Sequence, residues 1–508
     1  MSQTCIILVM AAYLLLMLYI GILANKRGSS SSQDEFYLGN RKIGPLVTAM
    51  SAEASDMSSY LLMGLPGLAY LTGICDVGWT VIGLAVGTYL NWLLVSRRLR
   101  RYSEKLGAIT IPDFFSKRYH DERNVLSMIS AVWILVFFVP YTASGFKAIG
   151  TLFQTLFGFD YHVSMLVGAL VVVLYTVIGG FVAVSTTDLI QSIVMTFSLL
   201  AIVIFGIYSA GGMGNVIENA KGLSGFLTMN ATYDAASGTA SPYGFLTIIS
   251  TLAWGLGYFG MPHILLRFMA IRNEKELKLS RRIASIWVVI SMAVAILIGV
   301  IGNAVSASGL IPALTTSSES ETVIICLANL LSKNGVIFAL IAGVAMSGIL
   351  ACTMSTADSQ LLQASSSFSK NILQDFFGMK MDDKKAMVYA RATVVIIAVI
   401  GVLLAWDPNS SVFTIVSFAW AGFGAAFGAL MLLSLFWKRT NKAGALAGML
   451  SGGICVFVWK FLVRPLGGAW NIYELLPAFV VSAVFTVVVS LLTKAPDESI
   501  VKEFEESK

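Results

Sequence analysis

The chain has 508 residues, of which 57% are hydrophobic and only 12% are charged. Soluble domains carry about 25% charged residues, so this composition excludes a soluble enzyme and indicates a polytopic membrane protein. The net charge of +6 does not indicate nucleic-acid binding, because the basic residues lie in short segments beside apolar runs. The five cysteines and three histidines are scattered without metal or redox spacing, which predicts no cofactor.

Apolar runs long enough to cross a bilayer recur along the whole chain. A span needs about 20 apolar residues, and the sequence predicts an all-α polytopic protein with about 13 transmembrane helices in one domain, residues 1–508. The first run has no basic start and no cleavage pattern, which indicates a true span rather than a signal peptide. The predicted spans are 5–25, 46–70, 75–96, 126–156, 162–183, 188–210, 243–270, 283–308, 335–370, 387–406, 412–437, 441–463 and 474–493.

The loop charges predict the orientation of the chain in the membrane. Basic residues cluster after the first, third, seventh, ninth and eleventh spans, while the alternate loops hold mainly Lys221, Lys333 and Arg464. By the positive-inside rule the N-terminus lies outside and the C-terminus in the cytoplasm, in agreement with an odd number of spans. We therefore predict a multi-pass protein of the cell membrane that functions as a monomer.

The second predicted span contains an acidic side chain. Asp56 lies among Ser55, Ser58 and Ser59, and Gly64-Leu-Pro-Gly67 follows. A charge at the bilayer centre costs roughly 2.5–3.5 kcal/mol on insertion scales and persists where it faces a cavity, an ion or a substrate. This predicts that Asp56 belongs to a transport site.

The seventh predicted span carries a second interruption, Trp254-Gly-Leu-Gly-Tyr258-Phe-Gly-Met261-Pro262. In a soluble helix each glycine costs about 1 kcal/mol and proline about 3 kcal/mol. Transporters are often inverted repeats whose first helices are broken at mid-membrane. We therefore predict two five-helix halves, 46–210 and 243–437, flanked by 1–40 and 438–508. The alternative is two kinked packing helices.

Polar side chains share one face of the ninth predicted span. Ser355, Asp358 and Ser359 are spaced i, i+3 and i+4. Sodium prefers oxygen ligands, so these hydroxyls and the carbonyls of the unwound second span would form a sodium site. Asp188, at the start of the sixth span, would complete a second cation site with Ser355, Asp358 and Ser359. The alternatives are hydroxyls bonded to their own helix and Asp188 acting as a helix N-cap.

Seven strings resemble the sodium:solute symporter family, and the similarity runs from about residue 34 to about residue 442. The resemblance implies a five-plus-five inverted-repeat core of the leucine-transporter type with extra helices at both ends. It also implies Na+-coupled uptake of L-proline. The strings are Ser55-Asp56-Met57-Ser58, Leu61-Leu-Met-Gly-Leu-Pro-Gly67, Trp254-Gly-Leu-Gly-Tyr258-Phe-Gly, Pro262-His263, Arg267-Phe-Met-Ala270, Met354-Ser-Thr356 and Trp420-Ala-Gly-Phe-Gly424.

The resemblance also implies roles for individual residues, with Na+ as the coupling ion. Asp56 resembles a residue needed for sodium binding, and Arg41 resembles a cytoplasmic-side arginine that matters for coupling. The sodium ligands would be the carbonyls of Ala54, Met57 and Cys352 and the hydroxyls of Ser355 and Thr356. The substrate residues would be Ser58, Tyr141, Trp254, Tyr258 and Pro262, with Ser59 and Met261 beside them.

The chain departs from the family pattern at several positions. Met261 stands where a glutamine is usual, and Ser59-Tyr60 replaces a Gly-Trp pair, so the resemblance supports sodium more firmly than proline. Glu53 and Lys147 add charges at positions that are usually uncharged, and Lys147 either snorkels or pairs with an acid.

Two other functions compete with proline uptake. One is a Na+ symporter of the same fold for another small amino acid or an organic acid. The other is a transporter-like sensor, which would need a signalling domain after the last span. An enzyme is not expected, because no metal, nucleophile or phosphate motif rises above background.

Overall fold

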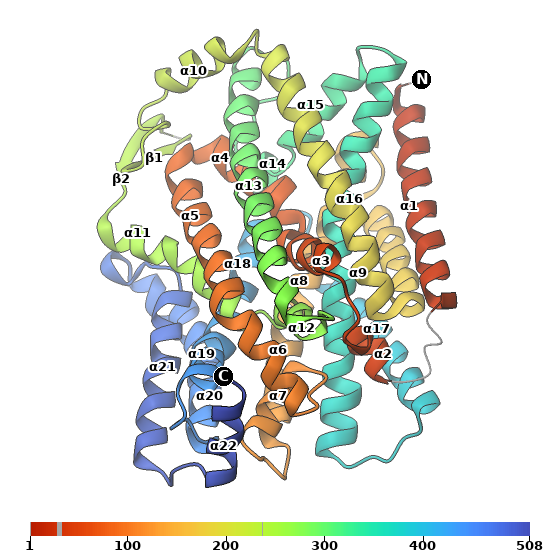
Figure 1. Cartoon of the computed structure of the whole chain (residues 1–508). Coiled ribbons are helices and arrows are strands. Elements are labelled where there is room, and N and C mark those ends of the chain that lie inside the picture. The colour runs from red at the N-terminus through yellow and green to blue at the C-terminus, as the bar shows by residue number, and fades with distance from the viewer. Residues whose placement is uncertain (1, 28–32, 236) are drawn as a thin grey trace.

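The computed structural model describes residues 2–27, 33–235 and 237–508. Its long helices form one bundle, and the two chain ends lie at opposite ends of that bundle (Figure 1). Helix α10 and a two-stranded hairpin lie at the end that holds the N-terminus. Helices α6, α7 and α22 lie at the other end, near the C-terminus (Figure 1).

The first half of the core begins with a helix that is interrupted in its middle. Its elements, after the N-terminal α1 (Ser2–Arg27), α2 (Gln33–Leu38) and η1 (Gly39–Arg41), are α3 (Pro45–Ser59), η2 (Tyr60–Gly64), α4 (Leu65–Thr72), α5 (Ile74–Leu90), η3 (Asn91–Val95), α6 (Ser96–Lys105), α7 (Ile111–Arg118), α8 (Val125–Phe157) and α9 (Tyr161–Ser209). The connection to the second half contains α10 (Met213–Gly222) and the antiparallel strands β1 (Ala231–Asp234) and β2 (Thr239–Pro242).

The second half also begins with an interrupted helix. Its elements are α11 (Phe245–Leu252), η4 (Ala253–Gly260), α12 (Pro262–Ala270), η5 (Glu274–Glu276), α13 (Leu277–Ala307), α14 (Ser317–Ser320), α15 (Val323–Ser332), α16 (Val336–Ser366), η6 (Ser367–Phe376), α17 (Asp383–Leu404), α18 (Val412–Phe423), η7 (Gly424–Gly428) and α19 (Ala429–Phe436). The C-terminal elements are α20 (Lys442–Val458), η8 (Trp459–Val463), η9 (Arg464–Leu466), η10 (Gly468–Trp470), α21 (Leu475–Leu492) and α22 (Glu498–Glu506).

The number of uninterrupted spans is smaller than the thirteen predicted. Among the described residues, ten helices are long and apolar enough to cross a membrane, and the pair 245–260 and 262–270, bent by 45°, makes an eleventh. The two remaining predicted spans, 46–70 and 162–183, are interrupted at Ser58 and Gly180, where φ is 47° and 63°. Sequence hydropathy does not register such breaks, because the residues on both sides stay apolar.

The C-terminal helix α22 docks on the basic end of the bundle. Phe504 is 2% exposed and lies under the guanidinium groups of Arg98 and Arg118. Around it, Lys105 pairs with Glu506 and His120 with Glu503. The acidic tail therefore covers part of the charge of the loop that follows the third span.

Candidate functional site

The first interruption lies at the centre of a buried polar segment. Every residue from Thr48 to Ser59 is buried, and Ser58 has φ 47° and ψ −169°, which breaks the helical hydrogen-bond ladder of α3. A break of this kind leaves backbone oxygens available to a ligand. The fold thus exposes carbonyls at the position where the sequence predicted a broken helix.

One hydroxyl of α16 meets a carbonyl of α3 beside this break. Ser355 Oγ donates to the carbonyl of Ala54 at 2.8 Å and approaches that of Cys352 at 3.2 Å. Thr356 Oγ1 donates to the Cys352 carbonyl of its own helix at 3.1 Å, so this hydroxyl makes the bond that the alternative interpretation predicted. Four of the five predicted sodium ligands therefore converge in one cluster. The fifth, the carbonyl of Met57, accepts from the backbone N–H of Tyr60.

The carboxylate of Asp56 contacts η4, in the other interrupted helix. Tyr258 Oη donates to Asp56 Oδ2 at 2.6 Å. Tyr141 Oη, from α8, lies 3.4 Å from both the Asp56 carbonyl and Ser58 Oγ. No recorded hydrogen bond of the described residues joins the Asp56 carboxylate to the α16 hydroxyls. Asp56 thus links the two interruptions, and its carboxylate does not contact the hydroxyls of Ser355 and Thr356.

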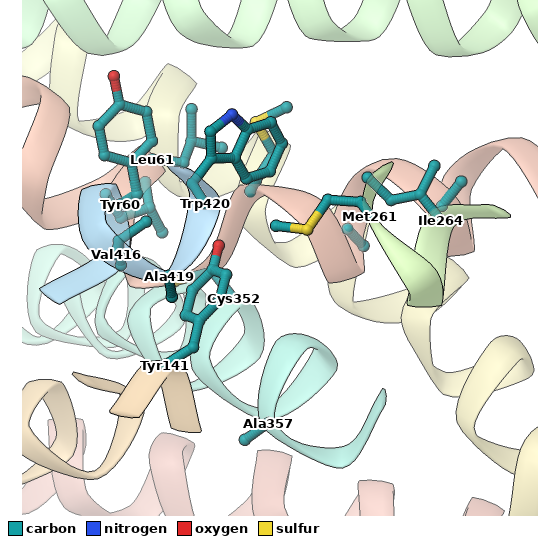
Figure 2. Packing of buried hydrophobic residues seen from close by; sticks show 14 of the residues in the cluster. Tyr60, Leu61, Tyr141, Met261, Ile264, Cys352, Ala357, Val416, Ala419 and Trp420 are labelled. Atoms are coloured by element: carbon teal, nitrogen blue, oxygen red, sulfur yellow. The ribbon is translucent and has the colours of Figure 1, made fainter. Parts of the chain in front are cut away.

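A small cavity adjoins Asp56. Tyr60, Tyr141, and the pair Val416 and Trp420 lie close together and come from three different elements, η2, α8 and α18 (Figure 2). The rings of Tyr60 and Trp254 stack at 5.9 Å across it. Its volume of about 10 Å³ is close to what one water molecule needs, so a solute enters only if the lining side chains move. The lining residues are Asp56, Met57, Tyr60, Leu84, Tyr141, Trp254, Met292, Val416 and Trp420.

The cavity gathers some of the predicted substrate residues and not others. Tyr141 and Trp254 line it, while Ser58 and Tyr258 contact its wall through Tyr141 and Asp56. The remaining three are buried but do not line the cavity: Ser59, Met261 and Pro262. Sequence reasoning missed Tyr60 and Trp420 as lining residues, although Trp420 lies in one of the strings used for the family resemblance and Tyr60 was noted as a departure from the family pattern.

The predicted second cation site contains a side chain that was not anticipated. Arg267, in α12, is 2% exposed, and its Nη2 lies 3.2 Å from Asp188 Oδ2 and 2.6 Å from Ser359 Oγ. Ser51 also donates to Asp188, at 2.6 Å. A guanidinium thus occupies the position opposite Asp188 that the sequence interpretation gave to a metal cation. Asp188 lies inside α9, well after the Gly180 break, so it is not a helix N-cap.

Arg41 ties together elements that come from both halves. It donates to the carbonyls of Met269 at 2.7 Å, Ala108 at 2.6 Å and Ser103 at 3.1 Å. Burial lowers the pKa of Arg41 to about 10, which leaves the side chain charged near neutral pH. Next to it, Ile43 N donates to the Ala270 carbonyl at 3.2 Å. The start of α3 and the end of α12 are therefore held together at this end of the bundle.

Lys147 pairs with an acid, so of the two interpretations offered by the sequence, snorkelling or ion pairing, the structure shows ion pairing. Its Nζ lies 3.3 Å from Glu321 Oε2, and both side chains are almost fully buried. Glu321 also accepts from the backbone N–H groups of Val412 and Phe413 at the start of α18. The pair thus connects α8 to α18 through the segment between α14 and α15.

Two interrupted helices that meet at a buried oxygen cluster, inside a bundle of apolar spans, define a multi-pass membrane transporter. A family profile of the sodium:solute symporter family matches residues 36–452. This chain belongs to the sodium:solute symporter family, which is a family of transporters and not of enzymes. The family predicted from the sequence strings is therefore confirmed.

Named relatives match over nearly the whole chain. The high-affinity proline transporter PutP of Bacillus subtilis is 41% identical, covering 96% of this chain and 98% of its own length. The osmoregulated proline transporter OpuE of Bacillus subtilis is 40% identical, with coverages of 97% and 95%. A sodium/proline symporter of Staphylococcus aureus is 39% identical, with coverages of 96% and 93%.

Solved structures confirm the predicted fold. A Na+-coupled sialic acid symporter in a substrate-bound, outward-open state matches with a TM-score of 0.78 at 18% identity, over 97% of this chain and 99% of that one. Mhp1, a nucleobase-cation-symport-1 family transporter in a closed conformation, matches with a TM-score of 0.56 at 13% identity, over 92% and 98%. The core therefore has the leucine-transporter type of fold.

Proposed function

We propose that this chain is a Na+-coupled symporter that imports L-proline into the cell by alternating access. The observation that carries the proposal is the contact of Ser355 of α16 with the Ala54 carbonyl of α3 near the Ser58 break, next to the Thr356 hydroxyl and the Cys352 carbonyl of α16. Hydroxyl and carbonyl oxygens are what a hard alkali cation requires. Relatives about 40% identical over the full length are named as proline transporters, which supports the choice of substrate.

Sodium in this proposal binds at the α3–α16 cluster, with the Met57 carbonyl as a further ligand. It bridges a helix of the first half and a helix of the second, so its binding orders the interrupted segment of α3. The Asp56 carboxylate accepts a hydrogen bond from Tyr258 and is therefore not a direct ligand of the ion. Asp56 acts on the ion through its negative charge and its backbone. The hydroxyls now bond to the carbonyls with which they would share the ion, so little rearrangement is needed to receive it.

The cavity beside Asp56 is the proposed substrate site. A pyrrolidine ring suits a wall formed by the rings of Trp254, Tyr60 and Tyr141, while Ser58 and the freed backbone groups face its charged end. Opening this cavity requires the aromatic rings to separate. Because sodium and substrate bind adjacent parts of the same interrupted helix, each raises the affinity for the other by the same factor.

Transport then follows from rocking of one helix group against the other around the fixed site. We propose that the halves are residues 46–210 and 243–437, flanked by 1–40 and 438–508. One charge crossing a potential of 100 mV provides about 2.3 kcal/mol. At about 1.4 kcal/mol per tenfold, this supports roughly 50-fold accumulation before any sodium gradient is added. Arg41, at the joined ends of α3 and α12, would couple ion binding to opening on that side.

The orientation proposed for the chain follows from its charges. Helices α6, α7 and α22, with the basic loops, lie at the end opposite the N-terminus (Figure 1). We place that end in the cytoplasm and the N-terminus outside, in the cell membrane, by the positive-inside rule. Both ligand sites lie within one chain, which supports a functional monomer.

Uptake into proteoliposomes tests the function. Labelled L-proline should accumulate when an inward Na+ gradient is imposed and should not when an equal K+ gradient replaces it. Unlabelled proline should compete fully, and glycine, alanine and small organic acids only weakly. Accumulation without Na+ would contradict the coupling, and stronger competition by another solute would contradict the substrate.

A Na+ symporter of the same fold for another small solute is the second candidate. The observation in its favour is the replacement of a Gly-Trp pair by Ser59-Tyr60, because Tyr60 lines the cavity directly. Its ring stacks on Trp254 and narrows the site. The competition panel above separates this candidate from a proline transporter.

A further inference from the structure

A tyrosine beyond the matched core packs against the aromatic wall of the proposed substrate site. Tyr473 lies between η10 and α21, past residue 452, where the match to the family profile ends. Its ring centroid lies 4.9 Å from that of Trp254, and the two ring planes are 17° apart, which is a stacked arrangement. Among the described residues, no other ring lies closer to Trp254. Trp254 lines the cavity and Tyr473 does not, so Tyr473 supports the wall without lining the site.

The hydrogen bonds of Tyr473 connect two helices that shape the cavity. Its Oη donates to the Ser417 carbonyl of α18 at 2.7 Å, and its backbone N–H donates to Ser250 Oγ of α11 at 2.6 Å. Helix α11 leads directly into η4, which carries Trp254, and α18 supplies the lining residues Val416 and Trp420. Tyr473 therefore joins the second interrupted helix to α18.

Trp254 is attached to α18 twice, once through its backbone and once through its ring. Trp420, one turn after Ser417 on α18, donates from Nε1 to the Trp254 carbonyl at 2.8 Å. The Trp254 ring is connected to the same helix through the stacked ring of Tyr473 and its hydroxyl. Turning the indole would separate the stacked rings, and stacked aromatic pairs are favourable beyond the area they bury. The two attachments therefore hold the indole in one orientation.

The segment that carries Tyr473 is itself fixed by buried ion pairs. Glu474 follows Tyr473 directly, and its side chain is fully buried. Its carboxylate lies 3.2 Å from Lys460 Nζ and 3.0 Å from Arg464 Nη1. Lys460 Nζ also lies 4.9 Å from the centre of the Phe418 ring of α18. A buried carboxylate loses much stability when a cationic partner leaves, so these pairs keep the segment between α20 and α21 in place.

We propose that Tyr473 is a positioning residue for the substrate, which sets the size of the solute that the cavity accepts by holding the Trp254 ring in place. With Tyr473 present, the wall fits the five-membered ring of proline. Without the Tyr473 ring, the indole gains the space that the ring occupied, and the cavity accepts a larger solute. The inference deepens the proposed function and rests on it, because it assumes that the cavity beside Asp56 binds the substrate.

Competition between proline and its six-membered-ring homologue, L-pipecolate, tests this role. Na+-driven uptake of labelled L-proline into proteoliposomes is measured for the wild type and for Tyr473→Leu, with unlabelled pipecolate as the competitor. In the variant, the KM for proline should rise roughly threefold to tenfold, because a stacked pair and a hydrogen bond are lost. The pipecolate concentration that halves uptake, divided by the proline KM, should fall at least about threefold.

The maximal uptake rate separates a positioning role from a purely structural one. A loss of stability alone would reduce the amount of folded protein and leave the KM and the pipecolate preference unchanged. A positioning role changes both, while the maximal rate per folded protein and the binding of radioactive sodium stay within about twofold. Size-exclusion chromatography of each purified protein measures the folded fraction.

Two further variants serve as controls. Tyr473→Phe keeps the stacked ring and loses only the bond to Ser417, so its proline KM should rise roughly twofold to fourfold with the size preference of the wild type. Tyr161→Leu is the matched control, because Tyr161 Oη also donates to a backbone carbonyl, that of Ala405, at 2.7 Å, but Tyr161 lies on α9 and does not line the cavity. Tyr161→Leu should keep the KM and the pipecolate preference of the wild type.

The outcomes that would overturn the inference leave the symporter function intact. They are an unchanged proline KM or an unchanged pipecolate preference in Tyr473→Leu, and an equal shift of both in Tyr161→Leu. If Tyr473→Leu does not fold, Tyr473→Phe decides, and a wild-type KM in that variant overturns the inference. Absence of Na+-dependent proline uptake by the wild type would instead contradict the proposed function itself.

Discussion

The two interrupted helices meet at one site but differ in how they are broken. The first breaks at a single residue, Ser58, and presents carbonyls to the hydroxyls of α16. The second is replaced over eight residues by 3-10 helix that carries Trp254 and Tyr258. Glycine is needed at 257, because a Cβ there would collide with the indole nitrogen of Trp420. In the proposed function, the first break therefore supplies oxygens for the cation and the second supplies a close-packed aromatic wall.

Removing the side chain that joins the two interrupted helices should have the largest effect. Arg267 of the second interrupted helix contacts Ser51 of the first and Asp188. Arg267→Met leaves the buried Asp188 without its cation, and breaking such a pair costs about 3–5 kcal/mol. We expect a large drop in the unfolding temperature and in folded yield. The double variant Arg267→Met with Asp188→Asn should recover much of the loss, and equal instability of both proteins would contradict this account.

A change confined to the aromatic wall should separate the two ligands. Trp254 stacks on Tyr473 at 4.9 Å and on Tyr60 at 5.9 Å. Trp254→Leu removes these ring contacts, and aromatic pairs contribute about 0.5–1.5 kcal/mol each. The proline concentration for half-maximal uptake should rise roughly threefold to tenfold, while Na+ binding without substrate stays within about twofold. A larger change in Na+ affinity than in proline affinity would contradict the separation of the sodium site at α3 and α16 from the substrate site at the aromatic wall.

The smallest effect is expected far from both breaks, at the docked helix α22. The ammonium of Lys105 lowers the pKa of Glu506 below its ordinary value of 4.5, and the ammonium groups of Lys508 and of Lys438, which lies on the bundle, do the same for Glu505. Groups with lowered pKa stabilise docking above pH 4.5 and lose that contribution as the pH falls through their folded values. Amide exchange of residues 498–506 should therefore be steady near neutral pH and faster near about pH 4. Equal protection of these amides at the two pH values would show that burial of Phe504, and not the ion pairs, holds α22 on the bundle.

Much of the arrangement could be predicted from the sequence, because it depends on local patterns. The glycines and proline between 254 and 262 mark the second break, and the spacing of Ser355 and Ser359 on one face of a predicted span directs their oxygens to neighbouring helices. The sequence did not predict Arg267 as the partner of Asp188, since the two lie far apart in the chain and come together only because α12 and α9 both pack against α3. Hydropathy also could not show that spans 46–70 and 162–183 are interrupted. All the ligand roles stay predictions, those of Ala54, Cys352, Ser355 and Thr356 as well as those of Met57 and Asp56.

Equilibrium binding of radioactive sodium to purified Thr356→Val shows whether Na+ binds between α3 and α16. Valine keeps the shape of threonine but removes the oxygen that now bonds to the Cys352 carbonyl. Hydrogen bonds to charged groups are worth about 1.5–3 kcal/mol, so Na+ affinity should fall by at least about tenfold while the protein stays folded. If Thr356→Val bound Na+ with the affinity of the wild type, Na+ binding between α3 and α16 would be contradicted.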